Sequence, residues 1–332
     1  MDPAAPDHPT NARWQALRRR AVLASVAMAG TLAATKLVVA LMSGSVAVLA
    51  SLADSLADVA ASSLALWSVV VANRPADEDH RFGHGKAEAI SSLVQAALVG
   101  GSGVFVVYSA VGRLLEPEPL RHTQLAIAVM VLSTIGSVAI VAIQSWTLRR
   151  VDSVAIEADS LHYRGDVLAN LSVIVAIVIA GRGGLGWVDP LVGALIAGYL
   201  FLTAFSIVRT SVDLLMDREL PEPERERIAA LVMADPDARG LHDLRTRSLG
   251  QGVHVELHLE LDGDLDLHRS HAITDRVERS IASAYPGSEV TIHTEPAGLD
   301  DERLDDRLLA GRASDKNSSA SRNPTEHRDV DG

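Results

Sequence analysis

The chain has 332 residues, of which 48% are hydrophobic but only 4% aromatic. The apolar residues are mainly Ala, Val, Leu and Ile in long blocks, which indicates membrane helices. There is no cysteine, so disulfides and thiolate metal sites are excluded. The formal net charge is −12 and no basic block stands out, which argues against binding to nucleic acid.

Residues 1–21 form a polar, arginine-rich segment that precedes six apolar stretches. Each stretch has about 20 residues or more, enough to cross a hydrocarbon core of about 30 Å, although the fifth opens with polar residues. Arginine and lysine concentrate in the N-terminal segment and in the loops after the second and fourth stretches, so we expect both termini in the cytoplasm. The predicted spans are 22–42, 46–71, 89–112, 124–148, 160–181 and 187–212, which together form a six-helix transmembrane domain over 22–212.

Residues 213–300 have a different pattern, typical of a small α+β domain. Amphipathic and alternating segments predict the order αββαβ, and between residues 219 and 300 there are 17 acidic and 8 basic residues. The last segment, 301–332, has few apolar residues and is predicted to be a disordered acidic tail. The predicted elements are a helix at 224–235, strands at 242–250 and 252–261, a helix at 266–284 and a strand at 288–295.

Two pairs of polar side chains interrupt the second and fifth spans. Asp54 and Asp58 are four residues apart, as are His162 and Asp166, so each pair lies on one helix face. A charge at the centre of a membrane helix costs on the order of 3 kcal/mol, which argues for a function. Four mixed nitrogen and oxygen ligands suit tetrahedral Zn²⁺.

A purely structural alternative stands beside this metal site. The two carboxylates of the second span could form ion pairs with Arg164 or Lys36. For Lys36 we expect instead that the ammonium group extends to the outer membrane interface.

The loop between the second and third spans holds a second candidate metal site. Asp77, His80 and His84 have the compact spacing D-x₂-H-x₃-H, and Gly83 and Gly85 allow the loop to bend around an ion. The alternative is a solvated polar loop.

A third candidate site is predicted in the α+β domain, where histidines gather on strands and a helix. Metal binding and ordinary surface histidines are both open here, and His254 and His268 are weaker candidates. The predicted ligands are His242, His258, His271, His293 and Glu295.

Six motifs in this order resemble the cation diffusion facilitator family, most closely its bacterial zinc and ferrous-iron efflux members. They are LADSLADVAAS, DEDHRFGHGKAEA, EADSLHYRGDVLAN, WVDPLVGALIAGY, HDLRTRSLG and VTIHTEP, and the resemblance covers residues from about 20 to 297. It implies six spans, a cytoplasmic metallochaperone-like αββαβ domain, a homodimer in a bacterial inner membrane, and efflux of divalent cations in exchange for protons.

The resemblance also implies roles for the three ligand sets. The four ligands in the spans correspond to the family's transport site, and the three ligands in the loop correspond to a further metal site. The ligands in the α+β domain correspond to a two-metal site, in which Glu295 stands where relatives often have Asp. In the family, His at the position of His162 is associated with zinc and cadmium, and Asp with manganese. We therefore expect Zn²⁺, with Fe²⁺, Cd²⁺ and Co²⁺ left open.

Two rival functions use the same ligands. A membrane-anchored metal sensor or buffer would need no paired ligands inside two spans, and a passive channel would avoid a tight four-ligand site because its ions must leave quickly. An enzyme is the weakest interpretation, since the sequence has no evident nucleophile–base arrangement or nucleotide motif.

Overall fold

The computed structural model describes residues 9–43, 46–115, 124–180, 188–299 and the single residues 303, 304 and 307. The chain divides into two compact units, Met1–Met216 with Leu249–Gln251, and Asp217–Ser248 with Gly252–Gly332. The predicted disorder of 301–332 falls outside the described residues apart from those three.

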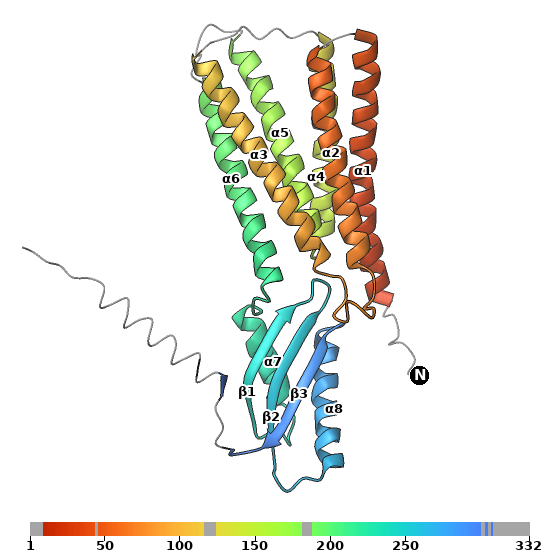
Figure 1. Cartoon of the computed structure of the whole chain (residues 1–332), viewed down its shortest axis with the longest axis vertical. Helices are drawn as coiled ribbons and strands as arrows, with labels where there is room; N and C mark the ends of the chain where they lie inside the picture. The colour runs from red at the N-terminus through yellow and green to blue at the C-terminus, as the bar shows by residue number, and fades with distance from the viewer. Residues whose placement is uncertain are drawn as a thin grey trace, which may run out of the picture. The chain divides into compact units, whose positions relative to one another are not determined.

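The first unit is a bundle of six long helices (Figure 1). Within the described parts of the chain, five of them are long and apolar enough to cross a membrane. The exception is α5, which has 27 residues but carries charged side chains in its first half. The helices are α1 (Pro9–Ser43), α2 (Val46–Ala72), α3 (Ala87–Leu115), α4 (Gln124–Leu148), α5 (Val154–Ala180) and α6 (Val188–Leu215).

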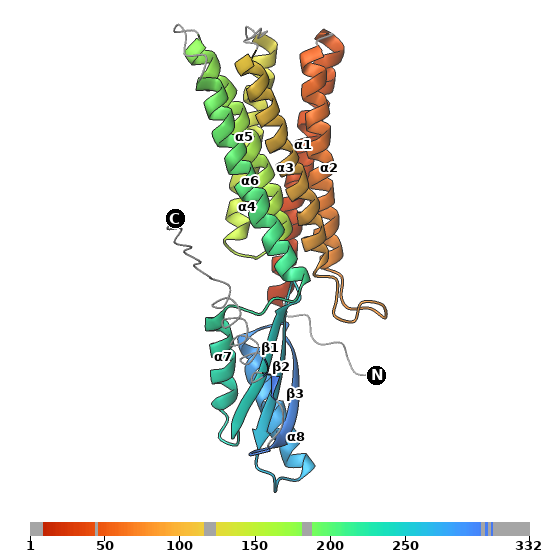
Figure 2. The same ribbon diagram turned by 60° about the vertical axis from the view of Figure 1, so that its left-hand side comes forward.

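Helix α5 packs against α2, α3, α4 and α6. Helix α1 contacts α2 and α4, and α4 contacts α5, whereas α3 lies along α6, as both views show (Figures 1 and 2). Where α3 meets α6, a Cβ on Gly103 would lie 3.4 Å from the Phe201 ring, which is an ordinary van der Waals distance. Large apolar side chains such as Phe105 and Leu202 are 69% and 75% exposed, which suits contact with lipid.

A buried carboxylate on α5 joins four helices. Asp159 is fully buried and accepts hydrogen bonds from Ser62 of α2 (3.0 Å) and from the Gln144 amide of α4 (2.6 Å). The same amide of Gln144 donates to Ser25 of α1 (2.8 Å). The Tyr163 hydroxyl lies 2.9 Å from that of Ser62. Because an unpaired polar group is costly away from water, this network fixes α5 against its neighbours.

We predict that Asp159→Leu lowers the stability of the bundle, because it removes the buried carboxylate that accepts hydrogen bonds from Ser62 and Gln144, a loss of about 1–3 kcal/mol for each bond. Thermal unfolding of the detergent-solubilised chain measures the loss. The matched control is Glu157→Leu on the exposed face of the same helix, which should unfold close to the parent. Equal destabilisation by the two substitutions would contradict the role of the network.

The second unit has the predicted order αββαβ. Its strands form one sheet in the order β1-β2-β3, with β2 antiparallel to β1 and parallel to β3. Element ends agree with the prediction to within two residues. The elements are α7 (Glu222–Met233), β1 (Gly240–Ser248), β2 (Val253–Leu261), α8 (Leu267–Ala284) and β3 (Glu289–Pro296).

Both helices of this unit cover the same face of the sheet. The odd-numbered residues of β2, such as Leu257 and Leu259, form a buried core with Ile228 of α7 and Val277 and Ile281 of α8. Successive side chains in a strand point to opposite faces. The even-numbered residues of β2 therefore lie on the opposite face, where three of the four predicted histidine ligands, His242, His258 and His293, are found.

Candidate metal sites

The structure brings three of the four predicted ligands inside the spans together. Donor atoms of Asp58, His162 and Asp166 all lie within 4.8 Å of one another. His162 Nε2 is 3.0 Å from an oxygen of Asp58 and 3.9 Å from one of Asp166. The side chains of His162 and Asp58 are 11% and 12% exposed. The contact between α2 and α5 thus concentrates one imidazole and two carboxylates around one point.

The fourth predicted ligand, Asp54, lies outside this group of three. It is one helical turn from Asp58, is exposed, and is close enough to interact electrostatically with Asp58 and His162. Asp54 therefore stands at the edge of the cluster.

Lys36 and Arg164, the two basic residues considered as ion-pair partners of the carboxylates, both form hydrogen bonds with serines. The expectation that Lys36 reaches the outer interface is wrong: its side chain is buried, and Nζ donates to Ser55 Oγ (2.6 Å) and to the Ser51 carbonyl (3.1 Å) on α2. Arg164 instead donates to Ser145 Oγ at 3.2 Å.

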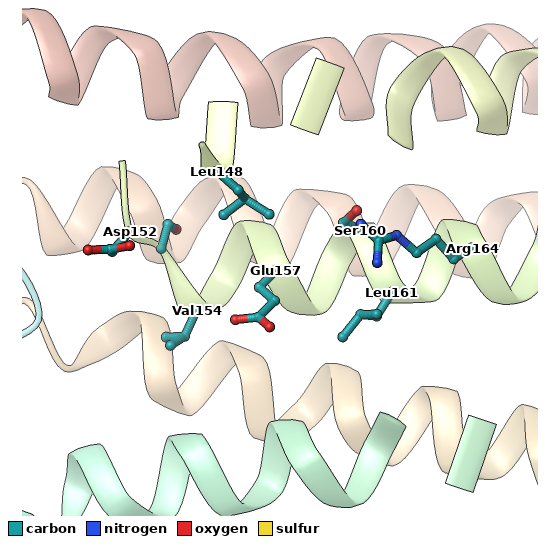
Figure 3. A pocket seen from close by; sticks show the side chains of 8 residues that line it. Leu148, Asp152, Val154, Glu157, Ser160, Leu161 and Arg164 are labelled. Atoms are coloured by element: carbon teal, nitrogen blue, oxygen red, sulfur yellow. The ribbon is translucent and has the colours of Figure 1, made fainter. Parts of the chain in front are cut away.

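Arg164 also lines a cavity of about 320 Å³ beside α5 (Figure 3). Glu157, Ser160 and Leu161 line it too, at the spacing of one helix face. With 100° of rotation per residue, that face is opposite to the one that carries His162 and Asp166. The cavity is therefore separate from the ligand cluster.

The loop ligands also come together. His84 Nε2 lies 3.2 Å from one oxygen of Asp77, and His80 Nδ1 lies 3.3 Å from the other. Gly83 has a φ of 79°, a backbone conformation that glycine adopts easily, as the predicted bend requires. The backbone N–H of His80 donates to Asp77 (2.7 Å) and is the main cause of the lowered pKa of that carboxyl group. The buried Nδ1 of His84 has no hydrogen-bond partner among the described residues, which fits a ligand atom.

Strand register builds the third site. His242 of β1 is paired with His258 of β2, which is paired in turn with His293 of β3, so three imidazoles form a row across the sheet. Neighbouring rings are 5.0 and 4.8 Å apart. A β-bulge directly after His242, where Asp243 has a positive φ of 49°, ends the regular pairing at this point.

Glu295 lies in the next row on the same face and closes the cluster. It is 2.8 Å from His242 Nε2 and 3.4 Å from His258 Nδ1, yet neither contact has hydrogen-bond geometry. Among the described residues these buried ring nitrogens have no hydrogen-bond partner, and because they face a carboxylate they suit a site for a soft-to-borderline cation. His242, His258 and Glu295 therefore fit a metal ion.

His271 is placed apart from this group. Its side chain is 72% exposed and its ring nitrogen lies 3.7 Å from Asp275, one turn along α8. His254 of β2 lies near Glu289 (3.8 Å) rather than in the row of three imidazoles.

Sequence reasoning missed Glu260. One of its oxygens lies 3.2 Å from His242 Nδ1 and accepts a hydrogen bond from Arg303 at 2.7 Å. The backbone N–H of Leu304 donates to Asp243, the bulge residue. Two-residue periodicity from His258 could have indicated Glu260, whereas its contact with Arg303 depends on the fold.

Comparisons with known proteins cover nearly the same residues as these sites. A model of the cation efflux transmembrane domain matches residues 22–216, and one of the cytoplasmic domain of cation efflux proteins matches 220–297. The chain belongs to the cation diffusion facilitator family. It is therefore a metal efflux transporter and not an enzyme, and it lies in the bacterial inner membrane with its second unit in the cytoplasm.

The similarity to two known relatives extends over almost the whole of their length. The cation-efflux pump FieF of Shewanella oneidensis is 42% identical over 287 residues, which are 86% of this chain and 96% of that protein. FieF of Klebsiella pneumoniae is 38% identical over 291 residues, 87% of this chain and 96% of that protein. A solved structure of CzrB in its zinc form is 39% identical, with a TM-score of 0.25, and covers 26% of this chain and 99% of that structure.

For this facilitator we predict that Glu260→Gln weakens zinc binding at the cytoplasmic site by about 10- to 100-fold, because a carboxylate that faces the free nitrogen of a ligating imidazole orients it. Zinc titration against a competing chelator measures the change. The full chain would carry Asp58→Ala and His80→Ala in this experiment to weaken the other two sites.

The matched control is Glu256→Gln. Glu256 lies on the same strand face but contacts Arg245 at 3.6 Å. An affinity for zinc that falls equally in both variants would mean that overall charge, and not the His242 contact, is responsible.

Proposed function

We propose that this facilitator exports a divalent cation, first of all Zn²⁺, from the cytoplasm in exchange for protons by alternating access. The ion is bound by Asp58, His162 and Asp166, with Asp54 completing the shell. The observation that carries the proposal is the convergence of three ligand atoms within 4.8 Å on two helices of the membrane unit.

Ligand chemistry supports zinc. One imidazole and two or three carboxylates match the nitrogen and oxygen donors of four-coordinate Zn²⁺, whereas Mg²⁺ and Ca²⁺ prefer oxygen donors alone. Fe²⁺, Co²⁺ and Cd²⁺ share part of this preference, so the ligand set narrows the choice without fixing one metal.

Proton exchange follows from the same atoms. A metal ion and a proton compete for the lone pairs of an imidazole or carboxylate, so affinity for the metal falls as the ligands are protonated. The reference pKa of imidazole is about 6.5, in the working range of a cell. A site that loads at the cytoplasmic side and opens outward, where protons are more active, would release the ion and return protonated.

We predict that Asp58→Ala and His162→Ala each lower the initial rate of zinc transport at least ~10-fold, since each removes a ligand from the cluster. The measurement is zinc flux into proteoliposomes under an imposed pH gradient. Asp152→Ala, an exposed carboxylate beside α5, is the control and should transport like the parent.

Parent-like flux in either ligand variant would show the assignment to be wrong. Saturable flux that depends on the pH gradient separates a carrier from a passive channel. Zinc binding without flux in the parent would identify a membrane-anchored sensor or buffer instead.

A competition series of zinc, iron, manganese and cadmium in the same transport assay tests which metal is carried. In the variant His162→Asp the preference of the site should shift from zinc toward manganese.

For the cytoplasmic unit we propose a regulatory role within a homodimer. Two copies of a domain with 17 acidic and 8 basic residues repel each other unless cations offset the charge. Metal bound at His242, His258 and Glu295, with His293 of the same row as a further ligand, would draw the two copies together when cytoplasmic metal is abundant.

We predict that chelation lengthens the distance between spin labels on the two cytoplasmic domains. The chain has no native cysteine, so Arg279→Cys on the exposed side of α8 offers a single labelling position. The same label on a chain with His242→Ala should not respond to chelation. An unchanged distance in the labelled parent would leave the cytoplasmic site without this regulatory role.

A further inference from the structure

Lys36 is a buried cation inside an apolar helix. It lies in the membrane-crossing segment Arg13–Met42, and only 5% of the residue is exposed. A lysine in such a helix normally extends its ammonium group to the interface, since a charge within the hydrocarbon costs on the order of 3 kcal/mol. This one remains inside, so the fold must stabilise its charge.

Two groups on α2 hold the ammonium. Nζ donates to Ser55 Oγ at 2.6 Å and to the carbonyl oxygen of Ser51 at 3.1 Å. Ser55 lies between Asp54 and Asp58 in the sequence, so the hydrogen bond fixes the lysine beside the helical turn that carries both carboxylates. The ammonium is near enough to Asp54 and Asp166 to interact electrostatically with both.

The Lys36 ammonium affects the net charge of the ligand cluster when a metal ion is bound. Ionised Asp54, Asp58 and Asp166 carry three negative charges, and a divalent cation bound with neutral His162 leaves one negative charge. The ammonium of Lys36 brings the loaded cluster to zero. A net charge in a low-dielectric interior is costly. The state in which the loaded site is closed to water on both sides is therefore lower in free energy when the cluster is neutral than when it is charged.

We infer that Lys36 is a fixed counter-ion of the transport site, a positioning residue that weakens metal binding but makes the loaded site electrically neutral and so permits rapid turnover. The inference rests on the proposed function of Asp54, Asp58, His162 and Asp166 as the ligands. It differs from a purely structural tie between α1 and α2, which would alter stability without separating KM from turnover.

The test is zinc transport in proteoliposomes by the full chain with Lys36→Gln. Glutamine keeps a side-chain N–H donor but carries no charge. We expect KM for zinc to fall at least threefold, because repulsion between the ammonium and the metal is lost, and turnover to fall at least tenfold. Lys36→Arg retains the charge and should keep both values within twofold of the parent. Arg20→Gln, an exposed cation on the same helix, is the control.

A double variant checks the charge balance. Asp54→Asn in the Lys36→Gln chain removes one negative charge and returns the loaded cluster to zero, so we expect the double variant to turn over faster than either single variant. Parent-like KM and turnover in Lys36→Gln would overturn the inference. Turnover in Lys36→Arg as low as in Lys36→Gln, or a double variant no faster than the single ones, would also overturn it.

These outcomes are distinct from failure of the proposed function. If the parent chain does not move zinc, the transport proposal itself fails. If the parent transports zinc and the ligand variants do not, the proposed function holds. The Lys36 variants then show separately whether Lys36 acts as the counter-ion of the transport site. Thermal unfolding of each variant in detergent, together with the charge-retaining Lys36→Arg, keeps the result interpretable if Lys36→Gln is poorly folded.

Discussion

Helix α5 has to bury charged and polar groups within a membrane bundle, and this constraint organises the first unit. One face of α5 carries Asp159, His162 and Asp166, and each has a partner on a neighbouring helix or on its own next turn. Asp159 is paired with Ser62, and His162 with Asp58, so two contacts about one turn apart join α5 to α2. Because unpaired polar groups are expensive without water, the network that stabilises the bundle also sets the distance between the ligands.

In the cytoplasmic unit the contacts that stabilise the fold also position the candidate ligands, and here the scaffold is a β-sheet. Antiparallel pairing of β1 with β2 and parallel pairing of β2 with β3 place His242, His258 and His293 in one row. The helices α7 and α8 cover the other face, which leaves this row on a surface that a second copy of the chain can approach. The ligands come from three strands, so the site exists only when the sheet is correctly paired.

The three candidate metal sites of this protein differ in how the charge of their side chains is offset. The cluster in the spans has a permanent cation, Lys36, held by hydrogen bonds on α2. The loop site relies on solvent exposure and on a backbone N–H that favours the ionised form of Asp77. In the cytoplasmic site, Arg303 contacts Glu260, which faces His242. A transported ion must leave again, and a neutral environment around the loaded ligands serves this need better than a strongly negative one.

The sequence by itself determined the architecture and indicated most of the side chains that meet in the candidate metal sites. Long apolar blocks and two-residue alternation depend only on local periodicity, so the helices and the order αββαβ follow from residue spacing. The i, i+4 spacing likewise placed Asp58 and the pair on α5 in advance. Only the tertiary structure decided the rest. Lys36 turned inward because Ser55 and Ser51 offered acceptors. Arg164 found its partner in Ser145 of α4, and Asp159 and Glu260 gained roles through partners distant in sequence. Such choices depend on which neighbour satisfies a buried charge, and that neighbour is fixed by packing between elements.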